Sequence, residues 1–317
     1  DVEATSKAVI QTVAAAASGG EGLGLAGALT VNTIDNDIAA SATGNDVDSS
    51  GNVTTIKATD DAKILSMAGS IGASAGAGVG ASIAVNDIGT KTIAEMNGGT
   101  WHAKDVTVSA TSTNPNAEGS DPAHQLDANI QTLAAGVGGG QVGGAASAAV
   151  NISTATIRAD ITGGANVTAE DNVGVLAANR QGVDVFAGSL GISADAVGLG
   201  IGAVVNYLND STSAYIDGGS SVNALAKNAS DTLAVNSGTL AHASDLDVSQ
   251  IHDASDYVNP DLSQTQANVT GVAVNAASSQ AVTTLGVSAA VAFDPFGSAA
   301  ITAMANANVL GGGTHAY

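Results

Sequence analysis

The sequence predicts an all-β chain folded as a parallel β-helix, that is, a β-solenoid with loops extruded from its coils. Three observations predict it. A short apolar motif recurs along the chain, the apolar side chains are small, and strand-like segments alternate in polarity. No segment sustains the spacing of an amphipathic helix. We assign residues 1–317 to a single solenoid domain.

The recurring motif is an apolar run that ends in Val-Asn or a close variant. Four copies place the asparagine at steps of 54, 65 and 55 residues, and a degraded fifth copy at 288–293 reaches Ala292 after a step of 86. Such a period is typical of architectures in which each unit buries its apolar face against its neighbours. The four asparagines are Asn32, Asn86, Asn151 and Asn206.

The length of the repeat sets the expected coil. If the 54 residues of a repeat cover two coils, each coil has about 27 residues, and stacking at about 4.8 Å gives a rod of roughly 55–60 Å. The asparagines would then lie about 10 Å apart, which is too far for a continuous ladder of side chains. We therefore expect them to be turn residues, a common role of asparagine.

The two irregular steps predict loop insertions. The step of 65 contains a stretch at about 113–127 with Asn-Pro-Asn and Ser-Asp-Pro sequences, and the step of 86 contains a stretch at about 238–266 that is rich in Asp and His. A solenoid tolerates loops extruded from single coils, because each coil contacts only its neighbours. Both insertions are therefore compatible with one continuous domain.

Each motif is followed by a further strand-like segment, a glycine turn and a short strand. Gly-Gly pairs at 98–99, 163–164 and 218–219 are expected at tight turns, where glycine adopts backbone angles closed to other residues. In 105–109, Val106 and Val108 alternate with hydroxyl residues, which predicts a half-buried strand with its valines in the core.

Composition excludes several classes of partner. The chain has 29 acidic and only 8 basic residues, a formal net charge of −21, so it lacks the basic surface that nucleic acids and anionic membranes require. It has no cysteine, so it holds neither disulfides nor a thiolate metal site. The uncharged stretches 64–86 and 128–157 are long enough to span a bilayer as helices, but Gly, Ala and Ser dominate them and no basic flanks adjoin them. We expect no membrane insertion.

The motifs together resemble the repeats of leukotoxin-like filamentous adhesins, which are similar to filamentous haemagglutinins. The resemblance rests on the Ala-Val-Asn run, on Tyr-Ile-Asp-Gly-Gly at 215–219 and on Val-Thr-Val-Ser-Ala at 106–110. It covers most of the chain. It implies a right-handed parallel β-helix in a very large bacterial exoprotein, exported by type V or two-partner secretion. No catalytic residue of that family has a counterpart here.

One cluster of oxygen donors is a candidate metal site. Asn45, Asp46 and Asp48 alternate in a turn that contains glycine, as a Ca²⁺ ion requires, and a solvated Asx turn is the alternative. No other cofactor is expected. The second insertion offers further ligand types for a divalent cation, and exposed loop residues are the alternative there. They are His242, Asp245, Asp247, His252, Asp253 and Asp256.

Two further motifs match enzyme signatures by composition alone. Gly22, Gly24 and Gly27 with Asp46 fit a dinucleotide fingerprint, and Ser74 lies in a Gly-x-Ser-x-Gly sequence typical of hydrolases. Both signatures require a helix after the motif, whereas strand is expected here. We therefore expect no catalytic residue and no enzyme, and a polysaccharide-cleaving β-helix enzyme is a distant alternative.

The expected function is that of a non-enzymatic structural or adhesive solenoid segment of a bacterial surface exoprotein, located outside the cell. Its partners would be neighbouring solenoid segments or ligands on cell surfaces, glycans included. The alternative is a subunit that stacks end to end into an extracellular filament, because open solenoid ends expose unpaired strand edges.

Overall fold

The chain is almost entirely β-strand in the residues that the structure, a computed structural model, describes: 1–44, 46–113, 128–241, 262–293 and 298–317. Most strands join one large parallel sheet that is wound on itself, so the predicted all-β parallel solenoid is confirmed. The strands are β1 (Val2–Ser6), β2 (Val9–Gly20), β3 (Leu23–Thr43), β4 (Asp46–Asp60), β5 (Lys63–Ser74), β6 (Ala77–Asn97), β7 (Thr100–Ser112), β8 (Ile130–Thr162), β9 (Asn166–Ala169), β10 (Val173–Ile216), β11 (Ser221–Ala224), β12 (Leu233–Leu240), β13 (Gln264–Val269), β14 (Val272–Ala292) and β15 (Ala299–Ala316).

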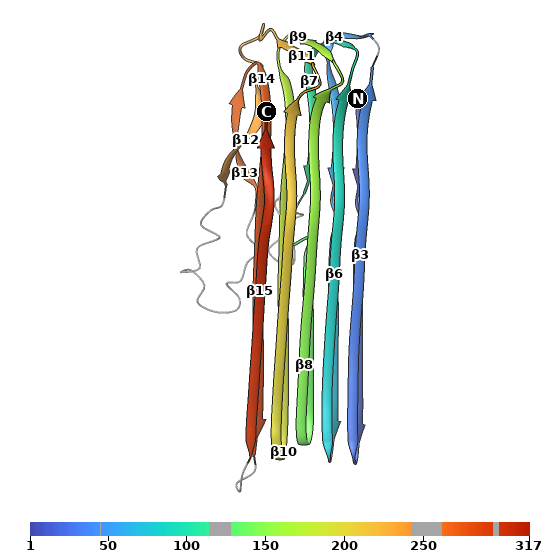
Figure 1. Ribbon diagram of the computed structural model, residues 1–317, viewed down its shortest axis with the longest axis vertical. Helices are drawn as coiled ribbons and strands as arrows, with labels where there is room; N and C mark the ends of the chain where they lie inside the picture. Colours follow the sequence, from blue (N-terminus) through green and yellow to red (C-terminus); the bar gives the residue numbers. More distant parts are fainter. Residues whose placement is uncertain (45, 114–127, 242–261, 294–297) are drawn as a thin grey trace.

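Each coil runs down one layer of the molecule and back up the other (Figure 1). The back layer contains β1 and β2, β4 and β5, β7 with the start of β8, the start of β10, and β14. The front layer contains β3, β6, the rest of β8 and β10, and β15. The two layers meet at the lower end of Figure 1, which we call the tip.

One sequence repeat forms one coil, so the expected coil of about 27 residues is wrong. Asn32 pairs in register with Asn86, which pairs with Asn151, which pairs with Asn206. The strands are long, with 21 residues in both β3 and β6, or about 70 Å at ~3.3 Å per residue. The long axis of the molecule therefore follows the strands, not the stack of coils (Figure 1).

The asparagines form a buried ladder, and the prediction that they are turn residues is also wrong. Each side-chain nitrogen donates to the side-chain oxygen of the next residue: 2.8 Å from Asn32 to Asn86, 2.9 Å from Asn86 to Asn151, and 2.8 Å from Asn151 to Asn206. A last bond of 2.7 Å joins Asn206 to Asn308. Neighbouring parallel strands in register bring identical side chains within hydrogen-bond reach, because they lie only about 4.8 Å apart.

The fifth copy of the motif is therefore at 303–309, and not at 288–293. Ala292 lies in β14 of the back layer, where its partner is Ser193. Asn308 lies in β15 of the front layer, where its partner is Asn206. Ala307 stands where a valine precedes the asparagine in the four earlier copies, and this substitution conceals the equivalence of 303–309 to them.

Each half of the molecule has a different interior. The upper half encloses large apolar side chains, among them Ile56, Met96, Trp101, Val108 and Ile157, all at most 6% exposed. Val106 and Val108 face this core, as predicted from the alternation of their strand. A second apolar cluster lies nearer the asparagine ladder and includes Ile64, Ile88 and Leu208.

The tip half is lined by glycine, and its two layers touch through their backbones. A Cβ atom on Gly138 would lie 1.7 Å from the carbonyl oxygen of Gly144, and one on Gly72 would lie 2.0 Å from that of Val79. Gly78 and Gly143, in the front layer, are equally close to the opposite backbone. Only glycine permits this approach, because it has no Cβ.

Glycine also shapes the upper turns, as predicted. The pairs at 98–99, 163–164 and 218–219 all have positive φ, between 66° and 78°. Residues 113–127 and 238–266, where loop insertions are predicted, lie in part outside the described residues. Of the second stretch, the structure describes an antiparallel pair formed by β12 and β13.

Candidate functional site

Asp46 and Asp48, two of the candidate calcium ligands, lie two residues apart on the exposed side of β4. The Oδ1 atom of Asp48 accepts a hydrogen bond of 3.0 Å from the backbone nitrogen of Ser50 and another from its hydroxyl. These two bonds lower the pKa of Asp48. The arrangement is that of an Asx turn. Asn45 lies outside the described residues, and so do the candidate ligands of the second insertion from His242 to Asp256.

The enzyme-like motifs lie in strands. Gly24 and Gly27 belong to β3 and Gly22 to the turn before it, and Ser74 ends β5. The Ser74 hydroxyl donates a hydrogen bond of 3.1 Å to the carbonyl oxygen of Gly22, and this bond joins two coils at the tip. Neither motif is followed by the helix that its chemistry requires.

A cluster of three aspartates that sequence reasoning missed lies at the upper end of the coils. Asp105, Asp171 and Asp231 bring carboxylate oxygens within 4.8 Å of one another. The Lys104 ammonium lies 3.3 Å from Asp105 and 3.9 Å from Asp171 and contacts Asp231. Its hydrogen bonds to Asp231 and Asp105 raise the pKa of Lys104. The cluster therefore carries its own cation. The Asp105 and Asp171 carboxylates also accept backbone N–H bonds from Asn172 and Asn228, which ties the turn at 225–232 to the coils.

A second charged group lies on the upper part of the front layer. Asp160 is buried, with 1% of its side chain exposed, and the Nε atom of Arg158 lies 3.0 Å from its Oδ1. Burial raises the pKa of Asp160 to about 6, more than the charge of Arg158 lowers it. Beside it, the rings of Tyr215 and Tyr317 stack with centroids 5.3 Å apart.

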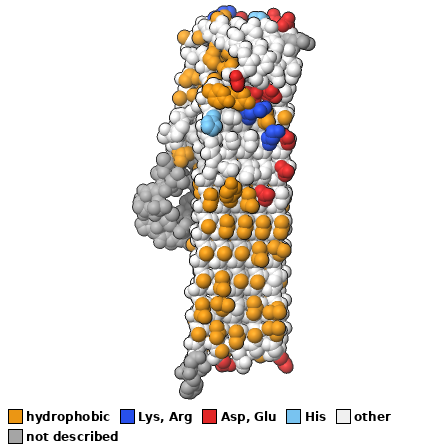
Figure 2. Space-filling model, in the orientation of Figure 1, with side chains coloured by type: hydrophobic (Ala, Val, Ile, Leu, Met, Phe, Trp, Pro, Cys, Tyr) orange, Lys and Arg blue, Asp and Glu red, His pale blue; other side chains and the backbone are white. Residues whose placement is uncertain are grey.

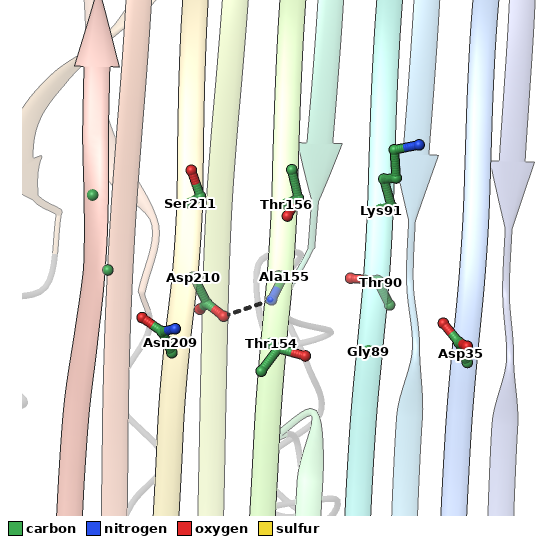
Figure 3. A pocket seen from close by; sticks show the side chains of 12 residues that line it. Asp35, Gly89, Thr90, Lys91, Thr154, Ala155, Thr156, Asn209, Asp210 and Ser211 are labelled. Atoms are coloured by element: carbon green, nitrogen blue, oxygen red, sulfur yellow. Dashed lines mark hydrogen bonds between the residues drawn. The ribbon is translucent and has the colours of Figure 1, made fainter.

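A groove of about 520 Å³ crosses the outer surface of the front layer, above the level of the asparagine ladder (Figure 3). Asp35, Gly89, Thr154 and Asn209 line it from four neighbouring coils. Gly89 contributes no side chain there, so the groove deepens over β6. Its polar walls offer hydrogen bonds to a polar ligand.

Asp210 lies beneath this groove and points into the solenoid. Its Oδ1 atom accepts a hydrogen bond of 2.9 Å from the backbone nitrogen of Ala155, which is drawn in Figure 3. Its Oδ2 atom accepts hydrogen bonds of 2.9 Å from the side-chain amides of Asn179 and Gln280. Burial raises its pKa in spite of these bonds. Asp210 is thus a buried hydrogen-bond acceptor with a structural role. Its carboxylate takes the place of a backbone carbonyl as the acceptor for the Ala155 N–H between β8 and β10.

The two ends of the stack are long strand edges. Among the residues that the structure describes, β3 pairs only with β6 and β15 only with β10, so each strand has one unpaired edge, along 21 and 18 residues, respectively. The asparagine ladder reaches both edges. At the last coil, the Nδ2 atom of Asn308 has no acceptor among the described residues, and at the first coil the Oδ1 atom of Asn32 accepts from Thr12 alone.

Within the described part of the chain, no helix is long and apolar enough to cross a bilayer. Comparison of the chain with family models, with curated proteins and with solved structures finds no match in any of the three.

Proposed function

We propose that the chain is a non-enzymatic, structural or adhesive β-solenoid segment of a large bacterial surface exoprotein, located outside the cell. Two features support this. The sequence repeats resemble those of leukotoxin-like adhesins, and the coils stack in one-to-one register. The single observation that carries the proposal is the pair of open edges, because a solenoid with unpaired 21- and 18-residue edges is built to be continued by further coils.

The experiment is immunogold labelling of intact cells that express the full parent gene, with antibodies raised against this chain. We expect label on the cell surface, at a distance from the membrane that grows with the number of solenoid repeats in the parent protein. Label confined to sectioned cytoplasm would contradict the proposal. A culture with the gene deleted is the control.

The second candidate is a subunit that stacks end to end into a filament, and the direction of the asparagine ladder favours it. Every bond in the ladder runs from the nitrogen of one coil to the oxygen of the next. A second copy added in register to the last coil would place its Asn32 oxygen beside the free Asn308 nitrogen. The edges are therefore complementary head to tail, the arrangement that generates open filaments.

Electron microscopy of the purified chain separates the two candidates. A subunit should form fibres whose length grows with concentration, and a segment that is continued only by its own chain should stay short. Asn308→Asp tests the joint, because it replaces the donor with a carboxylate and should abolish any fibres. Asn209→Asp, an outward-facing neighbour in β10, is the matched change of charge and should leave them intact.

A further inference from the structure

The tip half carries an apolar band on the outer surface of the front layer. The band consists of the outward-facing residues of 23–31, 77–85, 142–150, 197–205 and 299–307, which occupy equivalent positions in five neighbouring coils. Figure 2 shows the rows of hydrophobic side chains over the lower half of this layer. Leu29 is 61% exposed, Val31 64% and Ile83 44%.

The interior cannot bury these side chains. At the same height the two layers touch through glycine at positions such as Gly78 and Gly143, where a Cβ atom would collide with the opposite backbone and a leucine or valine has no space. The side chains that a solenoid normally encloses are therefore on its outside. Apolar patches of more than a few hundred Å² on a soluble protein mark interaction sites.

We propose that this band is the surface through which two copies of the chain pack face to face. Five strands spaced at about 4.8 Å and eight residue steps of about 3.3 Å give the band an area of roughly 600 Å². Two copies would bury about 1,200 Å², which is the lower limit for a specific, stable interface. The pairing is lateral, so it is independent of the end-to-end contacts discussed above.

The band is compatible with a second copy as the occupant because it is free of charge. The band contains no ionisable side chain in any of the five coils, although the whole chain has a net charge of −21. Two copies repel each other over most of their surface, and the band permits close approach without desolvating a charge. Its rows also repeat at the strand spacing, so the ridges of one copy fit the grooves of another, as in a steric zipper.

The surroundings of the band argue against a lipid bilayer as the occupant. Asp35 and Asp87 lie just above the band and Glu21 and Asp195 lie at the tip, where a membrane protein carries aromatic and basic residues. The unpaired edges of β3 and β15 would also be immersed in hydrocarbon, where open sheet edges do not occur.

The geometry makes a specific demand on one residue. Ala146 lies in the middle row of the band, on β8, which is the third of its five strands. If two bands cover each other fully, their centres coincide whatever the angle between the strands of the two copies. Ala146 of one copy then faces Ala146 of the other, and residues far from the centre have no such constraint.

The experiment is site-directed crosslinking, which the lack of native cysteine makes simple. Ala146→Cys should be joined into a covalent dimer by a short bis-maleimide, in at least tenfold higher yield than Thr156→Cys, an exposed residue ten positions further along the same strand and on the same face. Sedimentation of the unmodified chain should show a dimer at micromolar concentration. Ala148→Glu should shift it to monomer while its circular dichroism spectrum stays unchanged.

Three outcomes would overturn the inference: a monomer at all soluble concentrations, equal crosslinking at the two cysteine positions, or flotation of the monomeric chain with phosphatidylcholine vesicles. If Ala148→Glu does not fold, the crosslinking yields decide. The filament candidate is tested separately, because Asn308→Asp should remove fibres without affecting the face-to-face dimer, and Ala148→Glu should do the reverse.

Discussion

The upper half and the tip half of each coil are built from the same strands, yet their inner and outer surfaces are reversed. In the upper half, Met96, Trp101 and Ile157 fill the space between the layers, and charged groups such as Arg158 and Lys104 lie at the surface. In the tip half, glycine lies inside and leucine and valine lie outside. The size of the inward side chains sets the separation of the layers. That separation decides whether large apolar side chains lie between the layers or on the outer surface.

The comparison also identifies two sources of stability. The upper half gains burial energy from large side chains, at about 25 cal/mol per Å² removed from water. The tip half depends on the hydrogen bonds of its parallel ladders and on close contact between backbones. The asparagine ladder lies between the apolar cluster that contains Ile88 and Leu208 and the glycine-lined tip half.

The largest expected effect comes from a cavity in the upper half. Ile157→Ala should lower the free energy of unfolding by about 2–5 kcal/mol, because Ile157 is fully buried in the large apolar cluster. Ile83→Ala, on the outside of the tip half, should cost less than about 1 kcal/mol in the monomer. Urea denaturation of both variants at low protein concentration checks this. Equal losses would show that the two halves do not differ in the way described.

The reverse change tests the tip half. Gly138→Ala should destabilise by about 2–3 kcal/mol, because its new Cβ collides with the backbone of Gly144 and the layers must separate. Gly139→Ala is the matched control, since a Cβ there meets nothing within 4 Å, and it should be neutral within about 0.5 kcal/mol. The same denaturation assay applies. A neutral Gly138→Ala would remove the evidence for direct contact between the backbones.

A smaller effect is expected at the boundary between the halves. Asn151→Leu should cost about 1–2 kcal/mol, because the buried Asn206 oxygen loses its donor and Asn86 loses one acceptor. Asn308→Leu, at the exposed end of the ladder, should cost less than half as much. Thermal unfolding followed by circular dichroism measures both. If the two variants are equally stable, the ladder does not act as a buried network.

The smallest effect concerns pH. The pKa of Asp160 is about 6 in the folded chain and 3.8 in the unfolded one, so between these values the folded state binds more protons. Its contribution to stability is therefore present below about pH 4 and is lost as the pH rises through 6. Asp160→Asn should reduce this pH dependence by on the order of 1 kcal/mol. Unfolding curves between pH 4 and pH 7 provide the measurement, and an unchanged pH dependence in Asp160→Asn would contradict it.

The sequence alone was sufficient for the fold class and for several local features. The Val-Asn repeats predicted stacked parallel strands, the alternation at 105–109 placed Val106 and Val108 in the core, and the glycine pairs marked the upper turns. These features follow from local rules, because strand alternation and positive φ depend on a few consecutive residues. The handedness of the solenoid stays a prediction from the resemblance.

Features that depend on distant residues required the tertiary structure. The length of a coil was predicted at half its real value. The repeat gives the spacing of equivalent residues along the sequence, but it does not show whether one repeat forms one coil or two. The asparagine ladder and the cluster of Asp105, Asp171 and Asp231 follow from that register. In the glycine-rich strands both faces are small or apolar, so alternation distinguishes the two faces without showing which one is inside. Only the contact between the layers decides it, because a glycine fits where two backbones meet and a leucine does not.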